Sequence, residues 1–176
     1  MIRLAATAFV LALSTGCVVP ATLLLVDALD GDGPGVDYYQ DSNVSGQMRG
    51  ELPVTGAFDR ELSAGSLWRW EDTIDLELQV EGGGWAMLGG GFDLTGVDDG
   101  ETVVLGPDEH WVYGCSGASV WNAEFDEPAE EVVVTQERIE LDGEELVQLT
   151  IIATFADDHE VTAVVVEPVP APGGEG

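Results

Sequence analysis

Apolar and polar side chains alternate along most of the chain between residues 36 and 168. Residues 74–80 follow this pattern without a fault, because every second position is apolar and the positions between are acidic or amide. A period of two places successive side chains on opposite faces of a β-strand. We therefore predict a strand at residues 74–80 with one face turned to a core. Its inward side chains are Ile74, Leu76, Leu78 and Val80.

Three further runs near the C-terminus repeat the pattern and predict three more strands. Their inward residues are Val132 and Val134 in the first, Val147, Leu149, Ile151, Ala153 and Phe155 in the second, and Val161, Ala163 and Val165 in the third. Asp-Gly pairs at residues 98–100 and 142–143 suit tight hairpins, because they accept the positive φ that type I′ turns require. Residues 156–159 leave room only for a short turn between two strands.

The whole pattern predicts an all-β fold. We expect about nine to eleven strands, spaced every 8–12 residues and joined by short turns. No window of fifteen residues shows a helical period with caps, and the 23 glycines suit bulges and corners. Residues 36–168 are therefore predicted to form a single antiparallel β-sandwich or β-barrel domain.

The N-terminus has the features of an export signal. Arg3 is followed by an uncharged apolar run at residues 4–13, by small residues and by Cys17. A run of ten residues is too short to span a bilayer, so the segment is typical of a secretory signal peptide. The sequence Ser14-Thr15-Gly16-Cys17 resembles the lipobox of bacterial lipoproteins, with Ser14 where that family usually has Leu.

This resemblance implies that residues 1–16 are removed and that Cys17 carries acyl chains, such as palmitate. It also implies a membrane tether at the cell envelope, and the residue after the cysteine, Val18, implies the outer membrane. Two alternatives stay open, namely cleavage after Ala21 and an uncleaved anchor formed by residues 4–26. All three interpretations export the rest of the chain. We expect residues 17–35, which are rich in Gly and Asp, to form a linker, and residues 169–176 to form a disordered tail.

Charge excludes two kinds of partner. The chain has 34 Asp and Glu against five Arg and no Lys, for a net charge of −29. Binding nucleic acid or anionic lipid requires a basic patch, which so few Arg cannot supply. The chain is also 45% hydrophobic, which is enough to build a core. We interpret the acidic residues, for example Asp75 and Glu77, as a solvating coat on outward positions, with the inward positions free of charge.

Few residues offer catalytic or metal-binding chemistry. Without Lys, no Schiff base can form. Ser116 lies near His110 in sequence, but residues 114–117 are interpreted as a turn and not as a nucleophile loop. His110 and His159 each stand beside acidic residues and are interpreted as hydrated loop residues, not zinc ligands. The weak candidates for Ca²⁺ are Asp30, Asp32, Asp98, Asp99, Asp157 and Asp158.

Cysteine and tryptophan leave further alternatives. Cys115 shares its strand parity with Trp111 and Tyr113, so we expect it in the core. If Cys17 is not lipidated, a disulfide between Cys17 and Cys115 becomes available. The five Trp are interpreted as core and edge packing, whereas exposed Trp would indicate sugar binding by ring stacking.

These observations favour an exported, lipid-anchored, non-catalytic structural or binding protein of the cell envelope, with no cofactor. An envelope protein or a glycan is the expected kind of partner. One alternative is a surface module that binds cations or glycans. A second is a hydrolase that uses a pair of carboxylates across a cleft.

Overall fold

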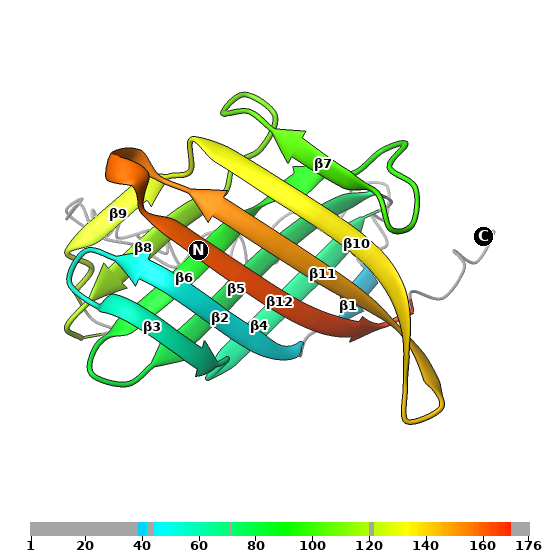
Figure 1. Ribbon diagram of the computed structural model, residues 1–176, viewed down its shortest axis with the longest axis horizontal. Coiled ribbons are helices and arrows are strands. Elements are labelled where there is room, and N and C mark those ends of the chain that lie inside the picture. The colour runs from blue at the N-terminus through cyan, green and yellow to red at the C-terminus, as the bar shows by residue number, and fades with distance from the viewer. Residues whose placement is uncertain (1–38, 42–43, 71, 120–121, 170–176) are drawn as a thin grey trace, which may run out of the picture.

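The computed structural model describes residues 39–41, 44–70, 72–119 and 122–169, and these form twelve strands in two antiparallel sheets. The first sheet contains, in spatial order, β1 (Tyr39–Asp41), β4 (Ala64–Trp70), β5 (Thr73–Glu81), β6 (Trp85–Asp93), β8 (Tyr113–Gly117) and β9 (Phe125–Pro128). The second sheet contains β3 (Gly56–Glu61), β2 (Ser45–Leu52), β12 (Glu160–Pro168), β11 (Glu144–Thr154), β10 (Glu131–Leu141) and β7 (Thr102–Leu105). The second sheet lies in front of the first in Figure 1. The fold is a β-sandwich, which is one of the two architectures predicted from the sequence, the other being a β-barrel.

The core lies between the sheets, where the predicted inward residues meet. Ile74, Leu76, Leu78 and Val80 of β5 are all buried, and so are the predicted inward residues of β10, β11 and β12. Phe155 follows β11 directly and is 1% exposed. Its ring packs edge-on against Phe125 of the first sheet, with centroids 5.9 Å apart. The alternation of apolar residues therefore identified the buried faces of four strands correctly.

One predicted hairpin is confirmed and the other is wrong. Asp142 (φ 53°) and Gly143 (φ 85°) join β10 to β11 with two successive positive φ angles, as a type I′ turn requires. Residues 98–100, in contrast, lie on the connection that leaves β6 in the first sheet and enters β7 in the second. Gly100 does have a positive φ of 78°. An Asp-Gly signal thus predicts the local turn, but it does not determine which strands that turn joins.

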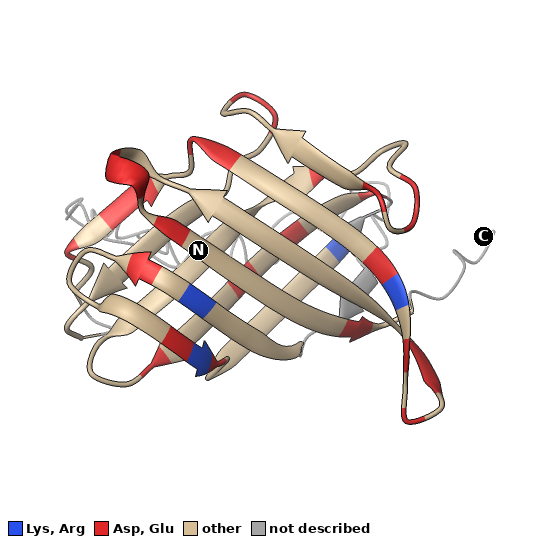
Figure 2. Cartoon of the chain, in the orientation of Figure 1, with Lys and Arg blue, Asp and Glu red and all other residues tan. Residues whose placement is uncertain are grey.

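The interior also contains charge, contrary to the expectation that inward positions are free of it. Arg69 of β4 and Glu167 of β12 point between the sheets, and their side chains are only 11% and 3% exposed. The Arg69 guanidinium donates to Glu167 Oε1 from Nη2 at 2.5 Å and from Nε at 3.0 Å. Nη2 also donates to Gln136 Oε1 at 2.9 Å. This cluster joins the two sheets, while most other acidic residues lie at turns and strand ends (Figure 2).

Candidate functional site

The outer face of the first sheet, turned away from the core, presents aromatic and acidic side chains in adjacent rows. Because the even residues of β5 point inward, Asp75 and Glu77 point outward. Across the sheet, Asp75 pairs with Trp68 of β4 on one side and with Gly91 of β6 on the other. Glu77 pairs with Gly89, which in turn pairs with Tyr113 of β8. We call the surface formed by Trp68, Asp75, Glu77, Trp111 and Tyr113 the aromatic face.

Two glycines of β6 make room for the rings of this face. A Cβ atom added to Gly89 would lie 2.7 Å from Cζ of Tyr113. One added to Gly91 would lie 2.3 Å from the backbone oxygen of Ile74, 2.6 Å from Asp75 Oδ1 and 2.8 Å from Cζ2 of Trp111. The two rings therefore lie across the backbone of β6, in the space that larger residues would fill. Aromatic rings that cover strand glycines in this way stabilise a sheet. They also present flat apolar surfaces on its outer side.

Trp111 is the most open of these rings. Its side chain is 51% exposed, and its indole Nε1 donates to Asp75 Oδ1 at 3.0 Å. Its backbone N–H donates to the carbonyl of Gly91, which fixes the segment against β6. The interpretation of all tryptophans as packing residues holds for Trp85, which is 5% exposed, but not for Trp111.

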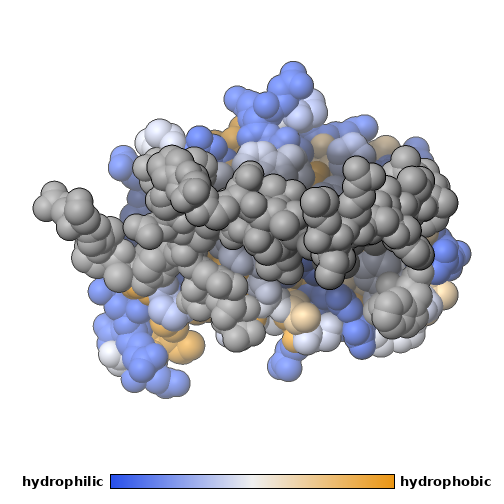
Figure 3. Space-filling model, turned by 180° about the vertical axis from the view of Figure 1, so that it is seen from behind, coloured by the Kyte–Doolittle hydropathy of each residue, from blue (hydrophilic) through white to orange (hydrophobic). Residues whose placement is uncertain are grey.

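The aromatic face is electrostatically negative. Burial raises the pKa of the Tyr113 hydroxyl, and the charges of Glu77 and Asp126 raise it further, so these carboxylates lie near that ring. Among the residues that the structure describes, Arg49, Arg60 and Arg138 belong to strands of the second sheet. Arg69 is the described Arg of the first sheet, and it points inward. Figure 3 views the molecule from the first sheet's side, where hydrophilic residues and some hydrophobic ones lie at the edges of the view.

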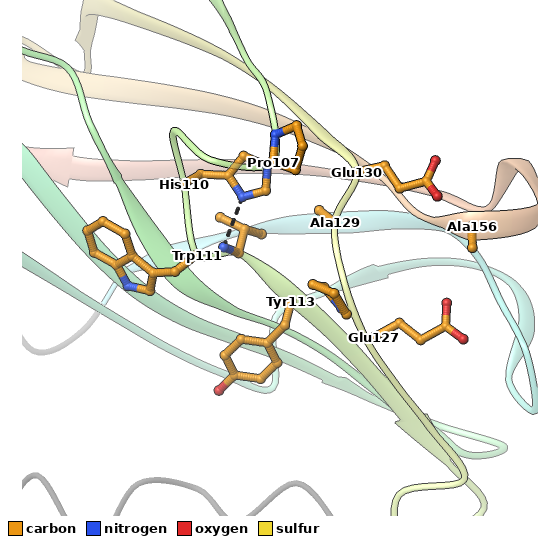
Figure 4. Close-up of a pocket in the computed structure, with 10 residues that line it drawn as sticks. Pro107, His110, Trp111, Tyr113, Glu127, Ala129, Glu130 and Ala156 are labelled. Carbon is orange, nitrogen blue, oxygen red and sulfur yellow. Dashed lines mark hydrogen bonds between the residues drawn. The ribbon is translucent and has the colours of Figure 1, made fainter.

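A shallow depression of about 660 Å³ adjoins the aromatic face. Its lining includes Pro107, His110, Trp111, Tyr113, Glu127 and Glu130. In Figure 4 the Trp111 and Tyr113 side chains extend to one side, whereas those of Glu127 and Glu130 extend to the other. The two carboxylates therefore do not converge on the aromatic rings.

His110 lies at the buried side of this depression and is not a hydrated loop residue. It is 9% exposed and forms an isolated β-bridge with Phe92. Nδ1 accepts a hydrogen bond from the Val112 N–H at 3.2 Å (Figure 4), so the proton of the neutral ring belongs to Nε2. Burial lowers the pKa of His110, while the charge of Glu109 opposes this shift. The ring is consequently neutral at pH 7.

Residues 114–117 form part of strand β8, which overturns their interpretation as a turn. Ser116 is fully buried, and its hydroxyl donates to the carbonyl oxygen of Pro53. Beyond this strand, Ser119 and Asn122 form an isolated antiparallel bridge. The glycines of this segment serve close packing, since a Cβ on Gly114 would lie 2.6 Å from the Phe155 ring.

Cys115 is buried as expected, but on the other side of the first sheet from the central core. The structure also gives it as disulfide-bonded, which is the alternative to a lipidated Cys17 that the sequence leaves open. It packs with Trp85 and Met87 in a second apolar cluster, against which Tyr113 and Ala123 also lie. These residues share the outer face with Gly89, because Met87 pairs with Cys115 across β6 and β8. The prediction that Cys115 lies on the same face as Trp111 and Tyr113 is correct. The prediction that this face is the one turned to the core is wrong.

The acidic Ca²⁺ candidates occupy separate turns. Asp99 Oδ1 accepts the backbone N–H of Arg138 at 2.8 Å, and the N–H of Asp98 donates to Glu101 at 3.1 Å. Asp157 and Asp158 lie in a short 3₁₀ turn, Ala156–Asp158, between β11 and β12. Across the described residues, no three His, Cys, Asp or Glu side chains are arranged to hold a metal ion. Asp30 and Asp32, like Cys17, lie outside those residues.

Comparisons with protein-family models, with curated proteins and with solved structures find no match to this chain. In the parts of the chain that the structure describes, no helix is long and apolar enough to cross a membrane.

Proposed function

We propose that this chain is an exported, non-catalytic binding domain of the cell envelope that is tethered through a lipidated Cys17 and binds a glycan. The observation that carries the binding role is the aromatic face, where the rings of Trp111 and Tyr113 lie close to the glycines of β6 and Trp111 is 51% exposed. Sugar rings stack on such surfaces through their apolar C–H faces. The neighbouring carboxylates of Asp75 and Glu77 are hydrogen-bond acceptors for sugar hydroxyl groups.

The hydrolase alternative has less support. A glycosidase sets two carboxyl groups across the bond that it cleaves, about 5–10 Å apart. Glu127 and Glu130 line the depression, but their side chains extend away from Trp111 and His110 (Figure 4). Binding by ring stacking would use Trp111 and Tyr113, whose side chains extend to the same side (Figure 4). We therefore favour binding over hydrolysis.

The binding role predicts a specific effect of removing the exposed indole. Trp111→Ala should weaken binding of a soluble N-acetylglucosamine hexamer by about tenfold, or about 1.4 kcal/mol, because the largest stacking surface is lost. Trp111→Phe should retain most of the affinity, since a flat ring remains. Isothermal titration measures both. Val104→Ala is the control, because Val104 is 57% exposed but lies on β7 in the other sheet. Equal affinities for Trp111→Ala and Val104→Ala would disprove the role of the aromatic face.

The tether is supported by the signal segment, the lipobox-like residues and the Gly- and Asp-rich linker that follows. Each buried methylene of an acyl chain contributes about 0.8 kcal/mol, so two or more chains hold an acidic protein at a membrane without basic residues. The proposed location is the outer membrane of a bacterial envelope.

Cys17→Ser should release the protein from the membrane fraction and abolish labelling with radioactive palmitate. Cys115→Ser should leave both unchanged, since the buried Cys115 is not the proposed acceptor. Intact mass under non-reducing conditions separates an acylated Cys17 from a Cys17–Cys115 disulfide, because one sulfur atom cannot carry both bonds. Membrane retention by Cys17→Ser would favour the uncleaved anchor instead.

A further inference from the structure

We propose that the aromatic face selects glycans whose sugars carry free amino groups, and that Asp75 and Glu77 confer this selectivity. The proposal rests on the glycan-binding function and specifies the chemistry of its ligand. It predicts that a glucosamine polymer binds better than the same polymer with acetylated nitrogens.

The first argument is the placement of negative charge around the rings. Asp75 and Glu77 stand on β5, one strand away from the glycines that the rings cover. Asp126 stands on β9, beyond β8, so carboxylates flank the rings from both sides in the order of the sheet. The raised pKa of Tyr113 agrees with this placement, since Glu77 and Asp126 both contribute to it.

The second argument is that the described residues of this face supply no positive charge to balance the carboxylates. Arg69 is directed into the core, where it is engaged by Glu167 and Gln136. His110, at the border of the face, is disfavoured as a cation, because burial lowers the pKa of its ring. The ligand therefore provides the compensating charge, and an anionic polysaccharide would be repelled.

The third argument is the chemistry of the rings themselves. The face of an indole or phenol ring carries partial negative charge and attracts an ammonium group above it. The hydrogen bond from Trp111 Nε1 to Asp75 holds the most exposed indole beside a carboxylate, so one ammonium group can contact both. A neutral N-acetyl group gains neither interaction. Stacking explains binding of either polymer, whereas the carboxylates discriminate between them.

The test compares hexamers of glucosamine and of N-acetylglucosamine by isothermal titration at about pH 6, where amines are largely protonated and carboxylates ionised. We expect the glucosamine hexamer to bind about tenfold more tightly at low salt. This preference should fall towards unity at about 1 M NaCl, where the screening length is near 3 Å.

Two variants locate the selectivity. Asp75→Asn and Glu77→Gln should each reduce the preference by about threefold, while affinity for the acetylated hexamer changes little. Asp59→Asn and Glu51→Gln are matched controls, because they remove the same charge from exposed positions of β3 and β2 in the other sheet. Each control should leave the preference unchanged.

The outcomes separate the two proposals. Equal binding of both hexamers would overturn the amino-sugar selectivity and leave the glycan-binding role intact. The selectivity would also be overturned if the controls Asp59→Asn and Glu51→Gln reduced the preference as much as Asp75→Asn and Glu77→Gln. The preference would then come from the net charge of the whole molecule. Failure of both hexamers to bind at millimolar concentration would overturn the glycan-binding role and the selectivity together.

Discussion

At the scale of single residues, the glycines of this chain serve close approaches as well as turns. Gly114 lies mid-strand in β8, where its missing side chain admits the ring of Phe155 from the opposite sheet. Gly89 and Gly91 do the same for the rings of the outer face. A glycine inside a predicted strand indicates a bulge or a close approach of another group. The sequence does not reveal which aromatic ring lies against each glycine. That ring comes from a strand or sheet distant along the chain.

Gly114→Ala should destabilise the fold by about 1–3 kcal/mol, because the added methyl group overpacks the core. The Phe155 ring is 1% exposed and cannot move into solvent. Chemical denaturation measures the free energy of unfolding. Gly106→Ala is the matched control, since its nearest neighbour would be a Glu109 oxygen at 3.5 Å. We expect that control to stay within about 0.5 kcal/mol of the parent. A similar stability for both variants would show that the core accommodates the methyl group.

At the scale of elements, the strands could be predicted from the sequence far better than their partners. Alternation is a local property, so it located β5, β10, β11 and β12 and their buried faces. Pairing is not local, because β2 lies beside β12 and β1 beside β4. For the same reason the hairpin predicted at residues 98–100 is wrong, because this segment connects the two sheets. The aromatic face depends on four strands side by side, so the sequence shows its tryptophans but does not predict how they are arranged.

The ion pair between β4 and β12 should contribute to holding the two sheets together. Glu167→Ala should reduce the free energy of unfolding by about 3 kcal/mol, because it leaves the Arg69 charge buried beside Gln136 without its carboxylate. The double variant Arg69→Met with Glu167→Leu should recover most of this loss, since no charge then remains in the interior.

The matched control for that experiment is the exposed pair of Arg138 and Glu145, whose side chains are 59% and 63% exposed. Glu145→Ala should change stability by less than about 0.5 kcal/mol, because solvent screens such pairs. If Glu167→Ala were as mild as Glu145→Ala, the inter-sheet cluster would be relaxed or hydrated and would not join the sheets energetically.

At the scale of the whole molecule, we interpret a net charge of −29 on 176 residues as a solvating coat, with the aromatic face as the one part proposed to bind a ligand. Most carboxylates of the described residues lie at turns and strand ends (Figure 2). Such charges keep the protein soluble, but they repel one another when the chain is compact. The aromatic face differs because its carboxylates lie beside the Trp111 and Tyr113 rings.

This coat predicts that added salt stabilises the fold. The melting temperature should rise between low and about 1 M NaCl, because the Debye length falls from about 30 Å at 0.01 M to about 3 Å at 1 M. Salt also weakens attraction, but the described residues form only one exposed ion pair, that of Arg138 and Glu145, so little attraction is lost. Calorimetry measures the melting temperature in NaCl and in sucrose of equal osmolality. Sucrose stabilises only through its exclusion from the protein surface, so a larger rise in NaCl reports the screening of repulsion between carboxylates. A melting temperature independent of NaCl would mean that the carboxylates are already far enough apart to interact weakly.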